Sequence, residues 1–218
     1  MNYNKIAILI PTFNPGESLI KTIDILNNNG FNLIIIVNDG SKNTEVFSKI
    51  SVDKVLKHDV NKGKGAALKT GFQYLQKLSF EGVITLDDDL QQDILDIKNI
   101  ANAFLNDKGI YFGVRKFEGA PIIRKIANKM ASKLFKLVYK EDICDTQTGL
   151  RCFPKENLFD LINIEGNRFE YEMNVLKYLA MKEIQIKKID IKTIYNDNKS
   201  HYRALKDSYQ IFKALLKK

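Results

Sequence analysis

Apolar runs alternate with amphipathic segments along the first ninety residues of the chain. Four runs are rich in apolar side chains: residues 5–11, 31–37, 52–56 and 82–86. Residues 16–29 and 66–78 carry apolar side chains close to a helical period. Runs of this kind are typical of strands in a parallel sheet that helices cover on both faces. The pattern therefore predicts an α/β fold with a mostly parallel central sheet and helices on both of its faces.

Polar residues follow each predicted strand, and the acidic triplet Asp87-Asp88-Asp89 is the most informative of these segments. Side chains alternate in direction along an extended chain, so Asp87 and Asp89 should point to one side and Asp88 to the other. An isolated acidic triplet is more often a solvated loop. Here, however, the segments that follow the predicted strands share one edge of the sheet, which is where ligands bind in such folds.

The same edge has the chemistry of a metal and phosphate site. Two converging carboxylates repel each other unless a cation lies between them, and oxygen ligands with room for substrate phosphates suit Mg²⁺ or Mn²⁺. The segment Lys62-Gly63-Lys64-Gly65 opens a predicted helix, so backbone N–H groups and two ammonium groups face any anion bound there. We expect a diphosphate at this position, although the segment lacks the spacing of a Walker P-loop.

Length and composition fit one globular domain. The 218 residues, of which 44% are hydrophobic, allow a sizeable core and exclude general disorder. We predict a single domain over residues 1–200 and a basic amphipathic helix over residues 201–218. No apolar run reaches the about 20 residues that span a bilayer, there is no signal peptide, and Cys144 and Cys152 lack the spacing of a metal site. These features predict a cytoplasmic protein that does not cross a membrane.

The positive charge of the chain is concentrated in two segments. Residues 115–140 contain eight Lys or Arg against one acid, a local net charge of +7, and residues 182–218 contain ten against four, a net of +6. Within them, residues 121–139 and 203–218 combine apolar positions at helical spacing with surrounding basic side chains. Such helices can lie in a membrane interface, where anionic lipid attracts them. The alternative is two ordinary helices that pack on the sheet and solvate their lysines.

Five short motifs occur in a familiar order: PTFN, VNDGS, NKGKGAALKTG, LDDDLQ and DTQTGLR. With them the chain resembles the family 2 inverting glycosyltransferases of the GT-A fold, and among these the polyprenyl-phosphate sugar transferases, which include dolichyl-phosphate mannosyl- and glucosyltransferases. The motifs run from residue 6 to about residue 172, and a weaker match continues through Ser200-His201-Tyr202-Arg203. The resemblance implies metal-dependent transfer of a hexose, from a donor of the UDP-glucose or GDP-mannose type, to a polyprenyl phosphate.

The resemblance also assigns the donor side of the site. Asp39 would accept a hydrogen bond from the nucleotide base, in a pocket lined by Pro11 and Phe13. Lys62, Gly63 and Lys64 would bind the diphosphate, and Asp87 and Asp88 would also take part in binding the nucleotide sugar. Asp87 and Asp89, with Gln91, would hold Mg²⁺ or Mn²⁺, and Asp89 would thereby be catalytic. Asp88 stands where relatives usually have a small neutral residue, and Gln92-Asp93 replaces a frequent His-Pro; these changes could shift the metal preference without removing a ligand.

The acceptor side is implied by the segment that contains Asp145 and Arg151, both expected to be catalytic. An arginine recognises phosphate through a bidentate fork, so Arg115, Arg124 and Arg151 are candidates to hold an acceptor phosphate. For Arg124 a solvated position is an equal alternative. A sugar hydroxyl would need a general base, which Asp145 or Glu170 would supply. A phosphate monoester is already anionic near neutral pH, in which case Asp145 would only orient groups.

Three more histidine, arginine and glutamate positions are weaker candidates. Glu170, His201 and Arg203 lie in segments that resemble family elements, whereas we expect His58 to cap a strand rather than to bind a metal. The implied location is the inner face of the cytoplasmic membrane, with peripheral attachment either directly or through a separate membrane protein.

Other functions stay open at this point. Transfer to a glycan hydroxyl in surface polysaccharide synthesis predicts that loss of Asp145 abolishes the chemistry and that activity needs no lipid. A nucleotide-sugar-binding module without activity is disfavoured by the complete set of candidate metal and phosphate residues. No groove-reading or base-stacking motif supports nucleic acid as a partner, and such binding would show a steep salt dependence.

Overall fold

One sheet of seven strands organises the part of the chain that the computed structural model describes, namely residues 3–89, 91–115, 122–143, 145–146 and 148–192, without the side chains of residues 122–127. The order of the strands in the sheet is β3-β2-β1-β4-β6-β5-β7. Their bounds are β1 Ile6–Thr12, β2 Leu33–Asp39, β3 Lys54–His58, β4 Gly82–Thr85, β5 Ile110–Arg115, β6 Arg151–Pro154 and β7 Ile186–Ile191.

Six of these strands run in the same direction, and β6 runs against them. The strand β1 pairs in parallel with β2 and β4, β2 with β3, and β5 with β7. The strand β6 is antiparallel to both of its neighbours, with Thr85 of β4 opposite Arg151. The prediction of a mostly parallel sheet is confirmed. Because β6 is reversed, its first residue lies at the edge where the other strands end.

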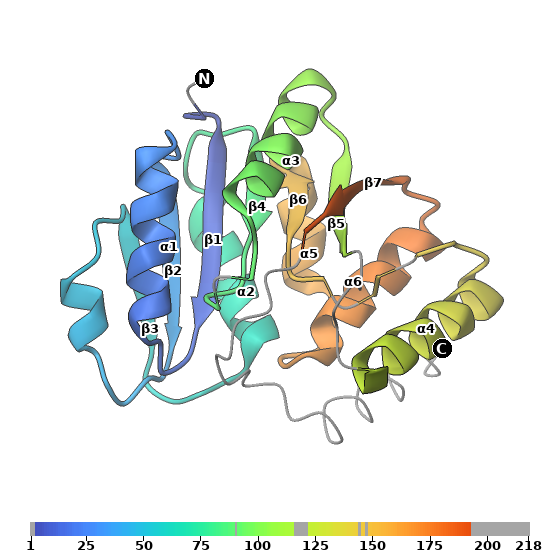
Figure 1. The fold of residues 1–218 in the computed structure, drawn as a ribbon, viewed down its shortest axis with the longest axis horizontal. Coiled ribbons are helices and arrows are strands. Elements are labelled where there is room, and N and C mark those ends of the chain that lie inside the picture. The colour runs from blue at the N-terminus through green and yellow to red at the C-terminus, as the bar shows by residue number, and fades with distance from the viewer. Residues whose placement is uncertain (1–2, 90, 116–121, 144, 147, 193–218) are drawn as a thin grey trace.

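Helices cover both faces of the sheet, as predicted (Figure 1). Side chains from α1 and α3 pack on one face, and side chains from α2, α5 and α6 pack on the other. The helix α4 contacts α6 and lies at the lower right of Figure 1, level with the carboxyl ends of the strands. The bounds are α1 Glu17–Asn28, α2 Lys64–Leu75, α3 Ile94–Asn106, α4 Ile122–Tyr139, α5 Leu158–Asn163 and α6 Glu170–Met181, with short 3₁₀ turns η1 Glu45–Ser48 and η2 Lys155–Asn157.

The alternation of side chains along β1 divides the core into two clusters. Ile6, Ile8 and Ile10 are fully buried on the α1 and α3 side, whereas Ala7 and Leu9 are fully buried on the α2 side. A strand that is apolar on both faces is possible only where both faces are covered, which explains why its sequence is an uninterrupted apolar run.

The helix α4 leaves apolar side chains in solvent although its sequence is amphipathic. Ala131 and Phe135 are buried, while Met130, Leu137 and Val138 are 55%, 78% and 44% exposed. The helix predicted for residues 121–139 is thus confirmed, whereas the one predicted for residues 201–218 lies outside the described residues. Within the residues that the structure describes, no helix is both long enough and apolar enough to span a bilayer.

Gly71 allows α2 to approach β1 closely, and this contact gives a test of the core. A Cβ atom at Gly71 would lie 2.2 Å from Cδ1 and 3.0 Å from Cγ of Leu9, which is fully buried. We expect Gly71→Ala to lower the free energy of unfolding by about 1–3 kcal/mol, because overpacking outweighs the helix propensity of alanine. Denaturant unfolding measures this change.

The same substitution in a protein that lacks the Leu9 side chain tests whether this contact is the cause. In a Leu9→Ala protein the added methyl group enters the space that the leucine left, so Gly71→Ala should there be neutral or stabilising. An equal cost in both backgrounds would contradict the proposed contact.

Candidate active site

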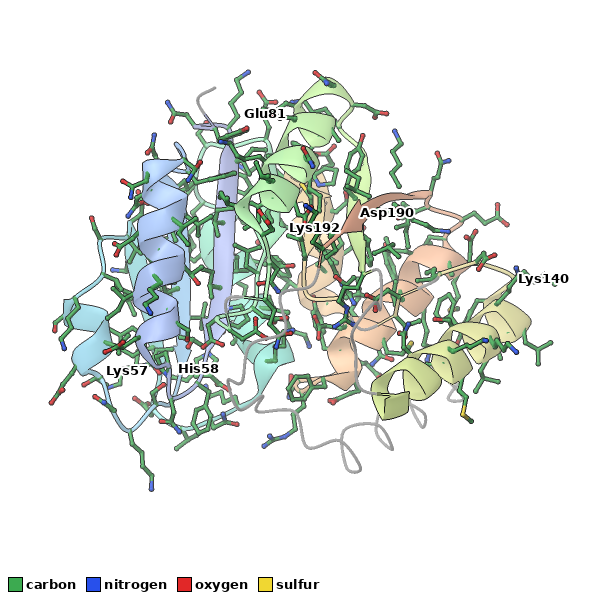
Figure 2. The ribbon with its side chains drawn as sticks, in the orientation of Figure 1. Lys57, His58, Glu81, Lys140, Asp190 and Lys192 are labelled. Carbon is green, nitrogen blue, oxygen red and sulfur yellow. The ribbon has the colours of Figure 1, made fainter. Side chains whose placement is uncertain are left out.

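The candidate residues of the donor and acceptor sides gather at one edge of the sheet. Six of them stand at or just beyond the ends of elements: Asp39 ends β2, Lys64 begins α2, Asp87 and Asp89 follow β4, Arg115 ends β5, and Arg151 begins β6. Figure 2 shows His58 at this carboxyl edge and Glu81 at the opposite edge of the molecule. The expectation that these segments share one edge is confirmed by the register of the strands.

Asp39 holds the loop that leads into α2. Its carboxylate accepts hydrogen bonds from the backbone N–H groups of Lys62 at 2.9 Å and Gly63 at 2.7 Å. His58 Nδ1 lies 2.7 Å from Asp39 Oδ1, and His58 Nε2 lies 2.9 Å from the Thr70 hydroxyl. His58 is buried and joins β2, β3 and α2, so it has a structural position rather than that of a metal ligand. The base-binding role of Asp39 stays a prediction.

The turns after β1 and β2 are tied together where we expect the nucleotide base. Asn14 has a left-handed backbone, with φ 50°, and its N–H donates to the Ser41 hydroxyl at 2.8 Å. Its side-chain oxygen accepts from the N–H of Lys42 at 3.0 Å. Pro11 is buried and Phe13 half-buried beside this junction. A rigid double turn next to an aromatic side chain is suited to a flat ligand.

Lys64 occupies a central position between two acidic side chains. Its Nζ donates to Asp87 Oδ1 at 2.7 Å and to Glu172 Oε1 at 2.9 Å, and its side chain is only 15% exposed. Removal from water by itself lowers the pKa of the ammonium, but the charges of Asp87 and Glu172 outweigh this effect and raise the pKa. Lys62 is exposed, so the two lysines of the motif have different environments.

Backbone geometry at Gly63 fixes the start of α2. This residue has φ +105°, which favours glycine, and a Cβ atom there would lie 2.4 Å from the carbonyl oxygen of Asn167. The same carbonyl accepts from the N–H of Ala66 at 2.9 Å. The loop at residues 62–65 and the segment before α6 are therefore packed directly against each other.

The acidic triplet divides its side chains among different partners. Asp87 faces Lys64, whereas Asp88 accepts a hydrogen bond from the Thr12 hydroxyl. This separation agrees with the predicted alternation. A Cβ atom at Gly149 would lie 2.2 Å from Asp87 Oδ2, so only glycine leaves room for this carboxylate. The glycine of the DTQTG motif is thus explained by its contact with the LDDD motif.

Asp87 and Asp89 fit a cation that is shared with a substrate. Burial and the charge of Asp87 raise the pKa of Asp89 to about 7, although the N–H of Gln91 donates to its Oδ1 at 3.0 Å. Removal from water would raise the pKa of Asp87 too, but Lys64 outweighs that effect and the pKa is lowered. Within the described ranges, no three His, Cys, Asp or Glu side chains form a metal cage. One or two carboxylates that leave positions for water and phosphate are the usual protein share of a Mg²⁺ site.

Arg115 and Asp145 form a buried ion pair on the acceptor side. Arg115 Nε lies 2.6 Å from Asp145 Oδ2, and Arg115 Nη2 lies 2.9 Å from Asp145 Oδ1. The Asp145 side chain has no exposed surface, while that of Arg115 is 21% exposed. Both carboxylate oxygens are thus engaged by one guanidinium group, an arrangement that fixes the direction of the arginine.

Arg151 is buried with part of its hydrogen-bonding capacity unused. Its Nε donates to the carbonyl oxygen of Thr148 at 2.9 Å and its Nη1 to that of Glu172 at 3.0 Å. The guanidinium carbon lies 4.6 Å from the centre of the Phe112 ring. Its Nη2 has no hydrogen-bond partner among the described residues. An unsatisfied buried donor is costly, and it suits an anion that arrives with the substrate.

Glu170 has its hydrogen-bond partners outside this cluster, and three other predicted residues lie wholly or partly outside the described part of the structure. Glu170 Oε1 accepts from the N–H groups of Asn167 and Arg168, which stabilises the turn that precedes α6. Arg124 lies in α4 but its side chain is outside the described part of the structure, as are His201 and Arg203. Burial raises the pKa of the Cys152 thiol and so disfavours the thiolate that a catalytic cysteine needs.

The contact between Glu172 and Lys64 was not predicted from the sequence. Glu172 is buried on α6, more than a hundred positions after its partner Lys64. Helical spacing equally allowed it to be a surface charge. A buried glutamate is rare without a partner, but its burial is visible only once α6 is packed against α2.

Comparison with known proteins places these features in context. The chain is 29% identical over 217 residues to a UDP-N-acetylglucosamine–dolichyl-phosphate N-acetylglucosaminyltransferase of Methanococcus voltae, a match that covers 88% of this chain and 86% of that protein. It is 27% identical over 206 residues to an uncharacterised protein of Methanocaldococcus jannaschii, with 90% of this chain and 84% of that protein covered.

A solved structure shows the same fold. Glucosyl-3-phosphoglycerate synthase from Mycobacterium tuberculosis, in complex with Mn²⁺, UDP and phosphoglyceric acid, superposes with a TM-score of 0.75 at 16% identity, and the match covers 98% of this chain and 78% of that chain. The predicted GT-A fold is therefore confirmed. The sequence profile of glycosyl transferase family 2 matches residues 7–159, which include all five motifs and the greater part of the sheet. The chain belongs to glycosyl transferase family 2 and is a glycosyltransferase.

Proposed function

We propose that the protein transfers a hexose from a UDP-sugar to a polyprenyl phosphate, with a divalent cation, at the cytoplasmic face of a membrane. The relative from Methanococcus voltae, whose name gives UDP-N-acetylglucosamine as donor and dolichyl phosphate as acceptor, supports both substrate classes. UDP in the mycobacterial synthase supports the same base. GDP-mannose, which the sequence left open, becomes the second donor to test.

The ion pair between Arg115 and Asp145 is the observation that favours a phosphate acceptor. A general base must offer a carboxylate oxygen to the proton that it removes, but both oxygens of Asp145 are engaged by the guanidinium group. A polyprenyl phosphate needs no base, because its second pKa of about 6 leaves an anionic oxygen at neutral pH. Arg115 and the unsatisfied Arg151 would instead hold the acceptor anion.

The transfer then needs one displacement at the anomeric carbon. An oxygen of the acceptor phosphate forms the new bond to this carbon while the bond to the donor diphosphate breaks, with inversion of configuration. UDP leaves with the electron pair of the broken bond, and no proton moves. A bound Mg²⁺ or Mn²⁺, held by Asp87 and Asp89, with Gln91 as a further candidate ligand, would stabilise the charge on this leaving group. Lys62, Lys64 and the N–H groups at the start of α2 would bind the same diphosphate.

Attachment to the membrane is assigned to the exposed stripe of α4. Met130, Leu137 and Val138 are exposed on this helix, together with Lys133 and Lys136. Apolar side chains among lysines favour an anionic lipid surface, and each basic residue near it contributes about 1 kcal/mol. Because α4 lies level with the carboxyl edge of the sheet, docking through it would bring the lipid phosphate to the arginines.

A donor panel tests the proposal directly. Purified protein with a short polyprenyl phosphate, Mg²⁺ or Mn²⁺, and radiolabelled UDP-N-acetylglucosamine, UDP-glucose or GDP-mannose should form a lipid-linked sugar with a UDP-sugar. Because the metal supplies several kcal/mol, EDTA or Asp89→Ala should reduce the rate by about 10²–10³-fold. Donor hydrolysis without any lipid product would redirect the assignment to a glycan hydroxyl acceptor.

The role of Asp145 is separable by kinetics. As a residue that positions Arg115, Asp145→Asn should lower kcat/KM for the lipid by about tenfold, mainly through KM, and leave the pH profile unchanged. A general base would instead cost about 10²–10⁴-fold in kcat and remove the acidic limb of the profile. Asp142→Asn, at an exposed carboxylate close by in the chain, is the matched control. Thermal unfolding checks that both variants fold.

Membrane docking has its own readout. Leu137→Glu should weaken sedimentation with vesicles that contain anionic lipid by about tenfold, since an interfacial leucine contributes about 1.5–3 kcal/mol. Leu95→Glu, at an exposed leucine of α3 on the other face of the sheet, should leave vesicle binding unchanged. Equal losses in the two variants would show that α4 is not the docking surface.

A further inference from the structure

The ammonium of Lys64 forms an ion pair with the carboxylate of Asp87, which the proposed function assigns to the metal. Its Nζ lies 2.7 Å from Asp87 Oδ1, and Gly149 closes the side of Oδ2, where even a Cβ atom would lie 2.2 Å away. A divalent cation that binds to Asp87 must therefore share this group with Lys64 or displace it. The same lysine stands at the start of α2, where the diphosphate is expected.

A second acceptor for the ammonium is already in place. Glu172 Oε1 lies 2.9 Å from Lys64 Nζ, and the Glu172 side chain is 11% exposed. The backbone of Glu172 is held too, because its carbonyl oxygen accepts from Arg151 Nη1 at 3.0 Å. The carboxylate of Glu172 is consequently fixed beside the site but belongs to another element than the metal-binding segment.

We propose that Lys64 is the resident counter-ion of Asp87 in the donor-free protein, and that Glu172 retains the ammonium when metal and diphosphate arrive. The inference rests on the proposed function, because the metal-bound donor is what would separate Asp87 from Lys64. In the donor-free protein, Lys64 offsets part of the negative charge of two carboxylates. It then contributes its charge to the diphosphate without leaving Asp87 unpaired.

Glu172 is in this scheme a positioning residue. With Glu172 present, the ammonium is shared and Asp87 keeps part of its negative charge for the cation. Without it, Lys64 pairs with Asp87 alone and opposes the metal more strongly. A cation–π contact agrees with this placement, since Lys64 Nζ also lies 5.9 Å from the centre of the Phe169 ring, just before α6.

The two residues therefore have opposite effects on metal binding in the absence of donor. An opposite charge within about 4–6 Å changes the proton affinity of a carboxylate by one to three pKa units, so removing Lys64 should strengthen cation binding at least about tenfold. Lys64→Met should bind Mn²⁺ more tightly without UDP but bind UDP more weakly. Glu172→Gln should bind Mn²⁺ more weakly than the unmodified protein. A lysine that only contacted the diphosphate would not strengthen Mn²⁺ binding when lost.

Titration of the full chain with Mn²⁺, followed by the electron paramagnetic resonance signal of the free ion, measures these affinities with and without UDP. Lys21→Met and Glu156→Gln remove the same charges at exposed positions, on α1 and η2, and should change the affinity less than about twofold. Circular dichroism verifies folding. If Lys64→Met does not fold, Glu172→Gln decides alone: weaker Mn²⁺ binding supports the inference and unchanged binding overturns it.

The outcomes separate the inference from the proposed function. Unchanged or weaker Mn²⁺ binding by folded Lys64→Met, without UDP, overturns the counter-ion role even when the donor panel yields a lipid-linked sugar. An unmodified protein that binds no Mn²⁺ with UDP present, and forms no lipid product, overturns the proposed function itself.

Discussion

The reversed strand β6 is the constraint on which the rest of the site depends. Its antiparallel ladders with β4 and β5 join the β3-β2-β1-β4 part of the sheet to the pair β5-β7. Because β6 begins where its neighbours end, Arg151 is placed opposite Thr85, two residues before Asp87. A parallel strand in this position would carry its first residue to the far edge of the sheet. The residues proposed to bind the donor and the acceptor meet because one strand runs in the opposite direction.

Charge compensation is the second organising feature of this edge. Lys64 is paired with Asp87 and Glu172, and Arg115 with Asp145, so charges that the fold removes from water are matched within the protein. Breaking such a pair on one side costs several kcal/mol, because the partner is left buried and unpaired. Among the described residues, Nη2 of Arg151 is an exception, and it is a buried donor that a substrate anion would satisfy.

The same pairs connect stability with catalysis in a glycosyltransferase of this family. Under the proposed function, a metal-bound diphosphate and a lipid phosphate would bring several negative charges and one doubly charged cation to an edge whose charged side chains are already paired. Substrate binding would therefore replace one ion-pair partner of a fixed side chain by another, instead of burying a charge that has no partner. The role proposed for Lys64 and Glu172 is one such exchange, and the position of Arg115 on Asp145 prepares another.

The layered α/β fold and the shared edge with most of its residues follow from the sequence. Uninterrupted apolar runs such as that of β1 can be buried only between two layers of helices, and the motif residues Asp39 and Asp87 stand at or just after strand ends, while Lys64 begins the helix that follows β3. The antiparallel direction of β6 was not predictable, since a four-residue strand carries no signal of its direction.

The pairing of the charged side chains, in contrast, depends on how the elements pack in three dimensions. Glu172 contacts Lys64, Gly149 makes room for Asp87, and Asp145 is held by Arg115, each across a long separation in the chain. Local periodicity places a residue on a strand or on a helix face. It does not state how two elements pack, and the partner of a buried charge depends on that packing.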